Sequence, residues 1–267
     1  MPKLVLVAKR VKSWIEPLLY RNLSVVCDGF ARRSGDDVIR ISTSNCLKVF
    51  ESKPASFIRD HVRHLALTQV PDKATAFILS RCTGALGLGI FQAAPNPSLL
   101  PAIAAMGLLQ ISVDIDRLFG DSGVDFRHFA FAQLTHLDLI NVPAPENWTT
   151  GICALPCLTH LSFNFDPDHK TNLGATASRH ILAECKSLEV LILIFSDAVD
   201  RKENDGYQYF SDDPRSVTMV VDTFLEDWEK GATGRDDYWA RAETFIQKRR
   251  AGEINGPEYS IPVGWET

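Results

Sequence analysis

The chain has 267 residues, 45% of them hydrophobic, which is enough to bury a sizeable core within one domain. Its formal net charge is −5 at pH 7, and no extended run of Lys and Arg is present, which argues against a nucleic-acid-binding surface. No stretch approaches the roughly 18 apolar residues that a membrane-spanning helix needs, so no membrane partner is expected.

Residues 1–26 predict a helix that is interrupted only at Glu16 and Pro17. Its apolar residues lie on one broad face and are Val7, Val11, Trp14, Ile15, Leu18 and Leu19. The apolar start at residues 4–8 is too short for a signal peptide, so we expect no targeting segment. Residues 27–60 are polar and broken, with a possible short strand at 38–41.

An internal repeat follows. The stretch LTHLDL at 134–139 recurs as LTHLSF at 158–163, and four further blocks share the pattern apolar-x-x-Leu-x-apolar. The second apolar residue of each block, here called the anchor, recurs every 23 to 30 residues. The anchors are Leu65, Leu88, Ile111, Leu137, Leu161 and Leu191. This period is at or just beyond that of leucine-rich repeats, and six units are enough for a solenoid.

Helical patterns alternate with the anchor blocks, at 72–81, 99–106 and 175–184. A strand followed by a helix at this period predicts an irregular α/β solenoid with a parallel sheet on its concave side and helices on its convex side. Cys82 and Cys185 both fall six residues before an anchor, where other units carry Phe131 and Leu155. We therefore interpret both cysteines as core residues of an intracellular protein, cytoplasmic or nuclear.

The C-terminal part begins with a charged, loop-like insertion at 197–213. A final strand at 217–221 and an amphipathic helix at 236–250 follow, and residues 252–267 read as a poorly ordered tail. The strand around Leu191 carries Val190, Ile192 and Ile194 where a half-exposed strand would have polar residues. That strand should be buried on both faces. We therefore expect part of 217–250 to cover the concave side there, as a helical cap.

The segment from Leu6 to Arg21, together with the repeats, resembles fungal F-box proteins with leucine-rich repeats, of the kind common in mushroom-forming species. The resemblance implies three parts: a helical cap at 1–26 that corresponds to the last part of an F-box, a solenoid at 27–216, and a C-terminal cap at 217–267. In that family the F-box recruits the adaptor subunit of a cullin-type ubiquitin ligase, and its first half should lie before Met1. An alternative role for 1–26 is to shield the open edge of the first repeat.

Polar residues concentrate on the predicted concave face of the third to fifth units. These candidate partner-binding residues are Gln110, Ser112, Asp114, His136, Asp138, His160, Ser162 and Asn164. His136 and His160 should lie on neighbouring strands with a carboxylate nearby, so a metal or acid–base site is conceivable. A metal also needs a fixed second shell, which the sequence does not reveal. We expect a partner-binding patch or ordinary surface, with no catalytic residue, no metal and no cofactor.

Other motifs carry no chemistry. Gly120-Asp121-Ser122-Gly123 echoes the nucleophile segment of trypsin-like proteases, but no matching histidine motif accompanies it, so a loop is the better interpretation. Cys153 and Cys157 are four residues apart without a second ligand pair, which argues against zinc. The sequence thus predicts a non-enzymatic protein-interaction module, with the resemblance implying the substrate receptor of a ubiquitin ligase. The alternative is a stand-alone binding scaffold with no ligase link.

Overall fold

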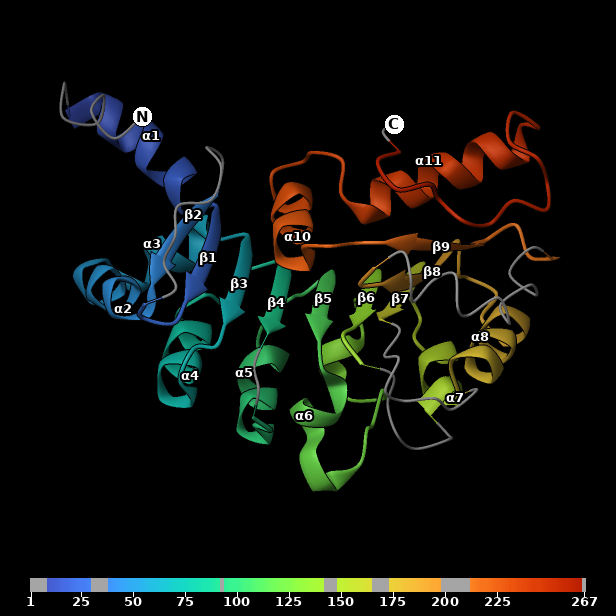
Figure 1. Cartoon of the computed structure of the whole chain (residues 1–267). Helices are drawn as coiled ribbons and strands as arrows, with labels where there is room; N and C mark the ends of the chain where they lie inside the picture. The colour runs from blue at the N-terminus through green and yellow to red at the C-terminus, as the bar shows by residue number, and fades with distance from the viewer. Residues whose placement is uncertain are drawn as a thin grey trace.

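The protein contains a nine-stranded sheet in which all neighbouring strands are parallel (Figure 1). The computed structural model describes residues 9–29, 38–91, 94–141, 148–164, 173–197 and 212–265. The strand order is β2-β1-β3-β4-β5-β6-β7-β8-β9, so the sheet is open and is not closed into a barrel. The strands are β1 (Asn22–Val26), β2 (Ile39–Ser42), β3 (His64–Thr68), β4 (Gly87–Phe91), β5 (Gln110–Val113), β6 (His136–Leu139), β7 (His160–Asn164), β8 (Val190–Phe195) and β9 (Ser216–Val220).

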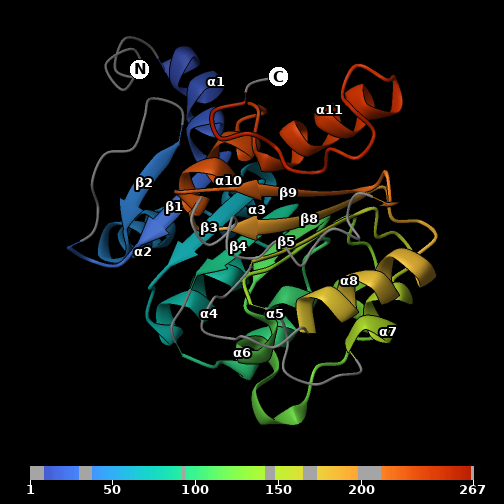
Figure 2. The ribbon, with the colours of Figure 1, turned by 45° about the vertical axis from the view of Figure 1, so that its right-hand side comes forward.

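Helices cover both faces of this sheet. Those that follow β2 and the strands from β3 to β7 lie on one face, and α10 and α11 lie across the other (Figures 1 and 2). The α/β class with a parallel sheet is therefore as predicted. The helices are α1 (Lys9–Tyr20), α2 (Thr43–Ser52), α3 (Ala55–His61), α4 (Asp72–Arg81), α5 (Leu100–Ala104), α6 (Ile115–Phe119), α7 (Trp148–Cys153), α8 (Leu173–Glu184), α10 (Phe224–Ala232) and α11 (Tyr238–Arg250).

The six anchors are paired from strand to strand, as the repeat predicts. Leu65 pairs with Leu88, Leu88 with Ile111, and the pairing continues through Leu137 and Leu161 to Leu191. Each anchor has no exposed surface and belongs to the large apolar cluster between the sheet and α2 to α8. Because side chains of a strand alternate between faces, the residues before and after each anchor point to the opposite side.

On that opposite side, a second apolar cluster lies between α11 and the last two strands. Val190, Ile192 and Ile194 of β8 pack there against α11, whose buried residues include Trp239 and Phe245. This arrangement confirms that β8 is buried on both faces and that part of 217–250 covers it.

Helix α10 lies over the first strands of the sheet. Gly89 of β4 makes room for the Phe91 ring, since a Cβ there would lie 2.8 Å from it, and Phe91 packs edge-on against Phe224 of α10 with ring centroids 5.7 Å apart. At the edge strand β2, Arg40 donates two hydrogen bonds of 2.8 Å to the carboxylate of Glu229. The Glu229 side chain is only 3% exposed, so this ion pair is largely screened from water.

The N-terminal third differs from prediction. The expected helix at 1–26 is shorter, because residues 22–26 form β1 between β2 and β3, and residues 1–8 lie outside the described part. The expected strand at 38–41 is present as β2. Residues 43–61, read as broken coil, form α2 and α3, whose Phe50 and Ile58 are buried. These short helices lack the long apolar periodicity on which the sequence reading depended.

The expectation of a poorly ordered tail was wrong for residues 252–265. Ser260 forms a parallel bridge with Thr218 of β9, and Ile261 is only 2% exposed. Arg249 donates a 2.9 Å hydrogen bond to the carbonyl of Glu258 and another, of 3.0 Å, to that of Ser216. Polarity alone suggested disorder, whereas a buried arginine ties the segment to the sheet. Most of the 197–213 insertion lies outside the described residues.

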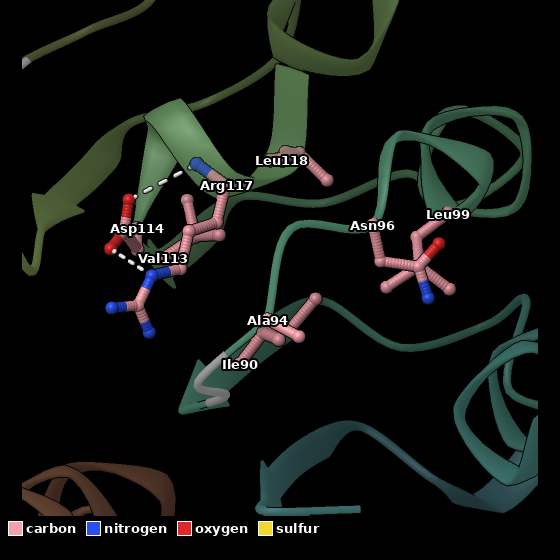
Figure 3. Close-up of a pocket in the computed structure, with 8 residues that line it drawn as sticks. All are labelled: Ile90, Ala94, Asn96, Leu99, Val113, Asp114, Arg117 and Leu118. Atoms are coloured by element: carbon pink, nitrogen blue, oxygen red, sulfur yellow. Dashed lines mark hydrogen bonds and ion pairs between the residues drawn. The ribbon is translucent and has the colours of Figure 1, made fainter. Parts of the chain in front are cut away.

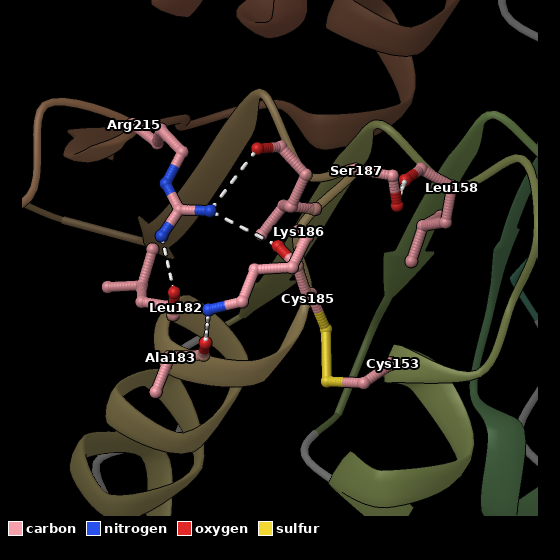
Figure 4. The surroundings of a disulfide bond; sticks show 9 residues. Cys153, Leu158, Leu182, Ala183, Cys185, Lys186, Ser187 and Arg215 are labelled. Carbon is pink, nitrogen blue, oxygen red and sulfur yellow. Dashed lines mark hydrogen bonds between the residues drawn. A yellow bond between two sulfur atoms is a disulfide. The ribbon is translucent and has the colours of Figure 1, made fainter.

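A disulfide joins Cys153, at the end of α7, to Cys185, directly after α8 (Figure 4). Beside it, Arg215 donates to the carbonyls of Leu182 and Cys185, and so satisfies backbone groups at the end of α8 (Figure 4). Cys185 is buried, as predicted, but it is bonded. Disulfides persist mainly in oxidising compartments, so this bond does not support the reducing compartment inferred from the cysteine pattern.

Candidate functional site

Most of the predicted partner-binding residues lie on the sheet face that α10 and α11 cover, and most of the set is buried. Ser112, Asp138 and Ser162 have no exposed surface, while Asp114 and His160 are 7% and 6% exposed. The expectation of an open concave patch is therefore wrong for these five residues. Gln110, His136 and Asn164 remain partly accessible.

His136 and His160 form a stacked pair on β6 and β7, because the two strands are in register at these positions. The ring centroids are 4.1 Å apart and the planes differ by 10°. Trp239 of α11 meets both rings edge-on, at 5.3 and 5.7 Å. Burial lowers the pKa of His136 to about 4, with a further contribution from His160. His136 is therefore neutral at pH 7.

Both imidazoles are held in the same way by the residue before them. His136 Nδ1 lies 2.9 Å from Thr135 Oγ1, and His160 Nδ1 lies 2.7 Å from Thr159 Oγ1. Each threonine hydroxyl donates its proton to the backbone, Thr135 to Leu109 at 3.0 Å and Thr159 to Thr135 at 3.3 Å. The hydroxyl oxygen must then accept from Nδ1–H, which leaves Nε2 as the nitrogen with a lone pair in the neutral rings.

Glu243 of α11 completes this cluster. Its Oε1 lies 2.8 Å from His160 Nε2, but the carboxylate is out of line with the ring, so Nε2 has no aligned hydrogen-bond partner. Interaction with His160 lowers the pKa of Glu243, which is therefore ionised at neutral pH. The Glu243 side chain is 43% exposed, whereas that of His160 is 8% exposed. The cluster thus reaches from the buried sheet face to solvent.

Asp138 is the most deeply buried carboxyl of the predicted set. Its Oδ1 accepts a 2.6 Å hydrogen bond from Ser162, and Oδ2 has no partner in the described part of the chain. Burial raises the pKa of Asp138 to about 7. The hydroxyl of Tyr238 is also buried, and desolvation together with the charge of Asp138 raises its pKa. Asp138 and Tyr238 are thus two buried titratable groups on the side of the sheet that α11 covers.

Asp114 has a structural role at the start of α6. It accepts a 3.2 Å hydrogen bond from the backbone N–H of Arg117 and pairs with the Arg117 side chain at 3.0 Å (Figure 3). Asn141 donates a further bond of 2.7 Å to it. The adjacent cavity has a volume of about 20 Å³, which accommodates no more than a water-sized molecule. This is N-capping geometry, and Asp114 does not join the histidine cluster.

A larger hollow, of about 740 Å³, lies between β9, the α10–α11 connection and the C-terminal segment. Its lining includes Asp227, Lys230 and Arg241. Both amino groups of the Arg241 guanidinium pair with Asp227 at 3.0 Å, and Lys230 pairs with Asp227 at 3.2 Å. The whole lining has three acidic residues, Asp222, Asp227 and Asp236, and three basic residues, Lys230, Arg235 and Arg241, so its formal charges balance and no strong preference for a charged ligand follows.

A different kind of surface is present on α1. Trp14 and Leu18 are 61% and 65% exposed, and a spacing of four residues places them on one face of the helix. Tyr20, at the end of α1, packs edge-on against Phe57 of α3, with centroids 5.3 Å apart, and Lys53 pairs with Glu16. One side of α1 is therefore docked while two large apolar side chains face outward.

Sequence reasoning found the histidines but missed Trp239 and Glu243. The helical spacing of 239 and 243 places them on one face of α11, yet no pattern in the sequence shows that this helix crosses β6 and β7. In the described residues, no helix is long and apolar enough to cross a membrane. Comparisons with known protein families, with curated proteins and with solved structures find no significant match.

Proposed function

We propose that this chain is a leucine-rich-repeat solenoid without catalytic activity that binds other proteins. Support comes from the consecutive parallel strands, the anchors paired from β3 to β8, and the helices that follow the strands from β3 to β7 on the same face. Each repeat of such a solenoid contacts only its neighbours, and its ends need caps. Helix α1 is next to the first strands and α11 covers the last, which fits those capping roles.

We further propose that α1 binds the adaptor subunit of a cullin-type ubiquitin ligase, so that the chain acts as a substrate receptor. The observation that carries this proposal is the exposure of Trp14 and Leu18 on one face of α1. Paired large apolar side chains at the surface mark interaction sites more often than isolated ones. They lie in the segment that resembles the last helix of an F-box.

A binding measurement with purified adaptor subunit tests the proposal. The full chain should bind the immobilised adaptor, and Trp14→Ala combined with Leu18→Ala should weaken binding more than tenfold. Phe129→Ala is the matched control, because Phe129 is 67% exposed and lies outside α1. Its affinity should equal that of the unmodified chain.

Two results would contradict the ligase proposal. The first is absence of adaptor binding by the folded, unmodified chain, which would leave the stand-alone scaffold as the better account. The second is equal loss of affinity in the Phe129 control, which would show that binding does not depend on α1. Circular dichroism of each variant separates these outcomes from loss of fold.

A further inference from the structure

We propose that His136, His160 and Glu243 bind one divalent transition-metal ion, of which Zn²⁺ is the type, between the sheet and α11. One potential ligand atom from each residue lies within 4.8 Å of the other two. This inference reverses the expectation of no metal, and it does not depend on the proposed function. The sequence does not reveal a second shell, meaning groups that hold the metal-binding side chains in place. The structure supplies one.

The second shell consists of Thr135 and Thr159. Metal-binding histidines almost always donate the other ring N–H to a fixed acceptor, which sets the tautomer and the ring orientation. Here each Nδ1–H donates to a threonine hydroxyl that is itself tied to a backbone carbonyl. Because the rings are stacked with a 10° difference between their planes and are held by equivalent bonds, their Nε2 atoms face the same way.

The contact between His160 and Glu243 also calls for a cation. His160 Nε2 lies 2.8 Å from Glu243 Oε1, and a contact this short between the two atoms needs a proton or a metal ion between them. His160 is 6% exposed, and its Nε2 has no aligned hydrogen-bond partner, so a proton alone leaves the contact poorly satisfied.

The donor set selects the class of ion. Two imidazole nitrogens and one carboxylate oxygen suit Zn²⁺ and related first-row ions, whereas Mg²⁺ and Ca²⁺ prefer oxygen ligands. A tetrahedral ion with bonds of about 2.0–2.1 Å would set the three donors roughly 3.4 Å from one another. Binding therefore requires the two stacked rings to tilt towards the ion, and Glu243 Oε1, now 2.8 Å from His160 Nε2, to move slightly away. The Glu243 side chain is 43% exposed and can make that movement. The same exposure gives the ion an entry route and leaves its fourth position to solvent.

Titration of the full chain with Co²⁺, after removal of bound metal with a chelator, tests the proposal. Tetrahedral Co²⁺ absorbs in the visible range, so binding reports geometry as well as affinity. We expect one Co²⁺ per chain with micromolar or tighter affinity, displacement by Zn²⁺, and a higher unfolding temperature in Zn²⁺. Glu243→Gln and His160→Gln should each weaken binding at least tenfold.

Two controls accompany these variants. Glu184→Gln removes an exposed carboxylate on α8, on the other face of the sheet, and Cys157→Ser removes an exposed free thiol that could itself bind Co²⁺. Both should bind like the unmodified chain. If His160→Gln fails to fold, Glu243→Gln decides the question, because its side chain is near the surface.

Either of two outcomes would overturn the inference. A folded chain that binds neither Co²⁺ nor Zn²⁺ at millimolar concentration would show that His160 and Glu243 form only an ion pair. Binding that survives Glu243→Gln but disappears in Cys157→Ser, with the absorption of a thiolate ligand, would assign the ion to the cysteine.

Discussion

The two faces of the sheet are covered by different parts of the chain. One face is covered by the helices that follow β2 and the strands from β3 to β7, and its core is built from the repeated anchors. The other face is covered by α10 and α11, which come from the end of the chain and combine an apolar cluster with buried ions and histidines. Local repetition therefore builds the first face, whereas the second depends on contacts between distant segments.

Removal of residues 222–267 should affect the two faces of the sheet most differently. That truncation deletes α10 and α11 and exposes the apolar residues of β8, while the other face keeps its helices. We expect the shortened chain to aggregate on expression, because an exposed apolar sheet face associates with other chains. A soluble truncated chain with a native circular dichroism spectrum would contradict the covering role of the C-terminal helices.

A core substitution on the repeat face should have the next largest effect. Leu137→Ala removes a fully buried anchor from β6 and leaves a cavity among its neighbours. The free energy of unfolding should fall by about 2–5 kcal/mol, which combines the transfer and cavity costs. Urea denaturation measures this change, and Leu109→Ala, at an exposed leucine, is the control. Equal midpoints for the two variants would refute the anchor assignment.

The ion pair beneath α10 should contribute less. Glu229→Gln leaves Arg40, whose side chain is 15% exposed, without its carboxylate partner. Breaking a buried pair costs about 3–5 kcal/mol, and we expect roughly 1–3 kcal/mol here because Arg40 retains some contact with water. Glu226→Gln is the matched control, since Glu226 is 54% exposed and lies 3.8 Å from the same arginine. Similar losses of thermal stability in both variants would refute this explanation.

An effect of similar size, but present only at higher pH, is expected at the start of α11. Asp237 accepts a 2.9 Å hydrogen bond from Ala240, but burial raises the pKa of its carboxyl to about 6, and the charge of Asp227 adds to this. The folded state then holds the proton more tightly than the unfolded state. The contribution of Asp237 to stability is therefore greatest below pH 4 and is lost as the pH rises towards 6.

Asp237→Asn tests this dependence, because asparagine can also cap a helix and carries no charge. Relative to the unmodified chain, the variant should be more stable by about 1–3 kcal/mol at pH 8 and nearly equal at pH 4. Asp236→Asn, at an exposed neighbour, should show no such trend. Unfolding curves of the variant and of the unmodified chain at pH 4 and pH 8 measure this difference in stability. The same difference at both pH values would exclude the titration of Asp237 as its cause.

The sequence predicted the repeat face well and the opposite face poorly. Each anchor lies in the same short pattern, which recurs every 23 to 30 residues, so the pairing of the anchors follows from local pattern alone. The burial of β8 was also predictable, because Val190, Ile192 and Ile194 occupy positions that are mostly polar in the third to fifth units. The burial of Ser112, Asp138 and Ser162 was not predictable, because polar residues indicate solvent exposure. No nearby sequence pattern reveals the helix above them.

The histidine cluster could also be predicted only in part. Its two strand residues were found, since the near-identical blocks at 134–139 and 158–163 place them side by side. Glu243 lies 83 residues beyond His160 in the chain, and only the path of α11 brings the two together. A site assembled across such a distance requires tertiary structure, which periodicity does not specify.

Thiol labelling of Ser162→Cys tests most directly whether α10 and α11 cover the second face of the sheet. Ser162 has no exposed surface beneath α11, whereas the native Cys157 is exposed and Cys82 is buried on the repeat face. In the folded chain Cys157 should react at once, while the introduced thiol should react as slowly as Cys82 and only become reactive in denaturant. Labelling of the introduced thiol as fast as Cys157, in a chain with native circular dichroism, would contradict the covered face.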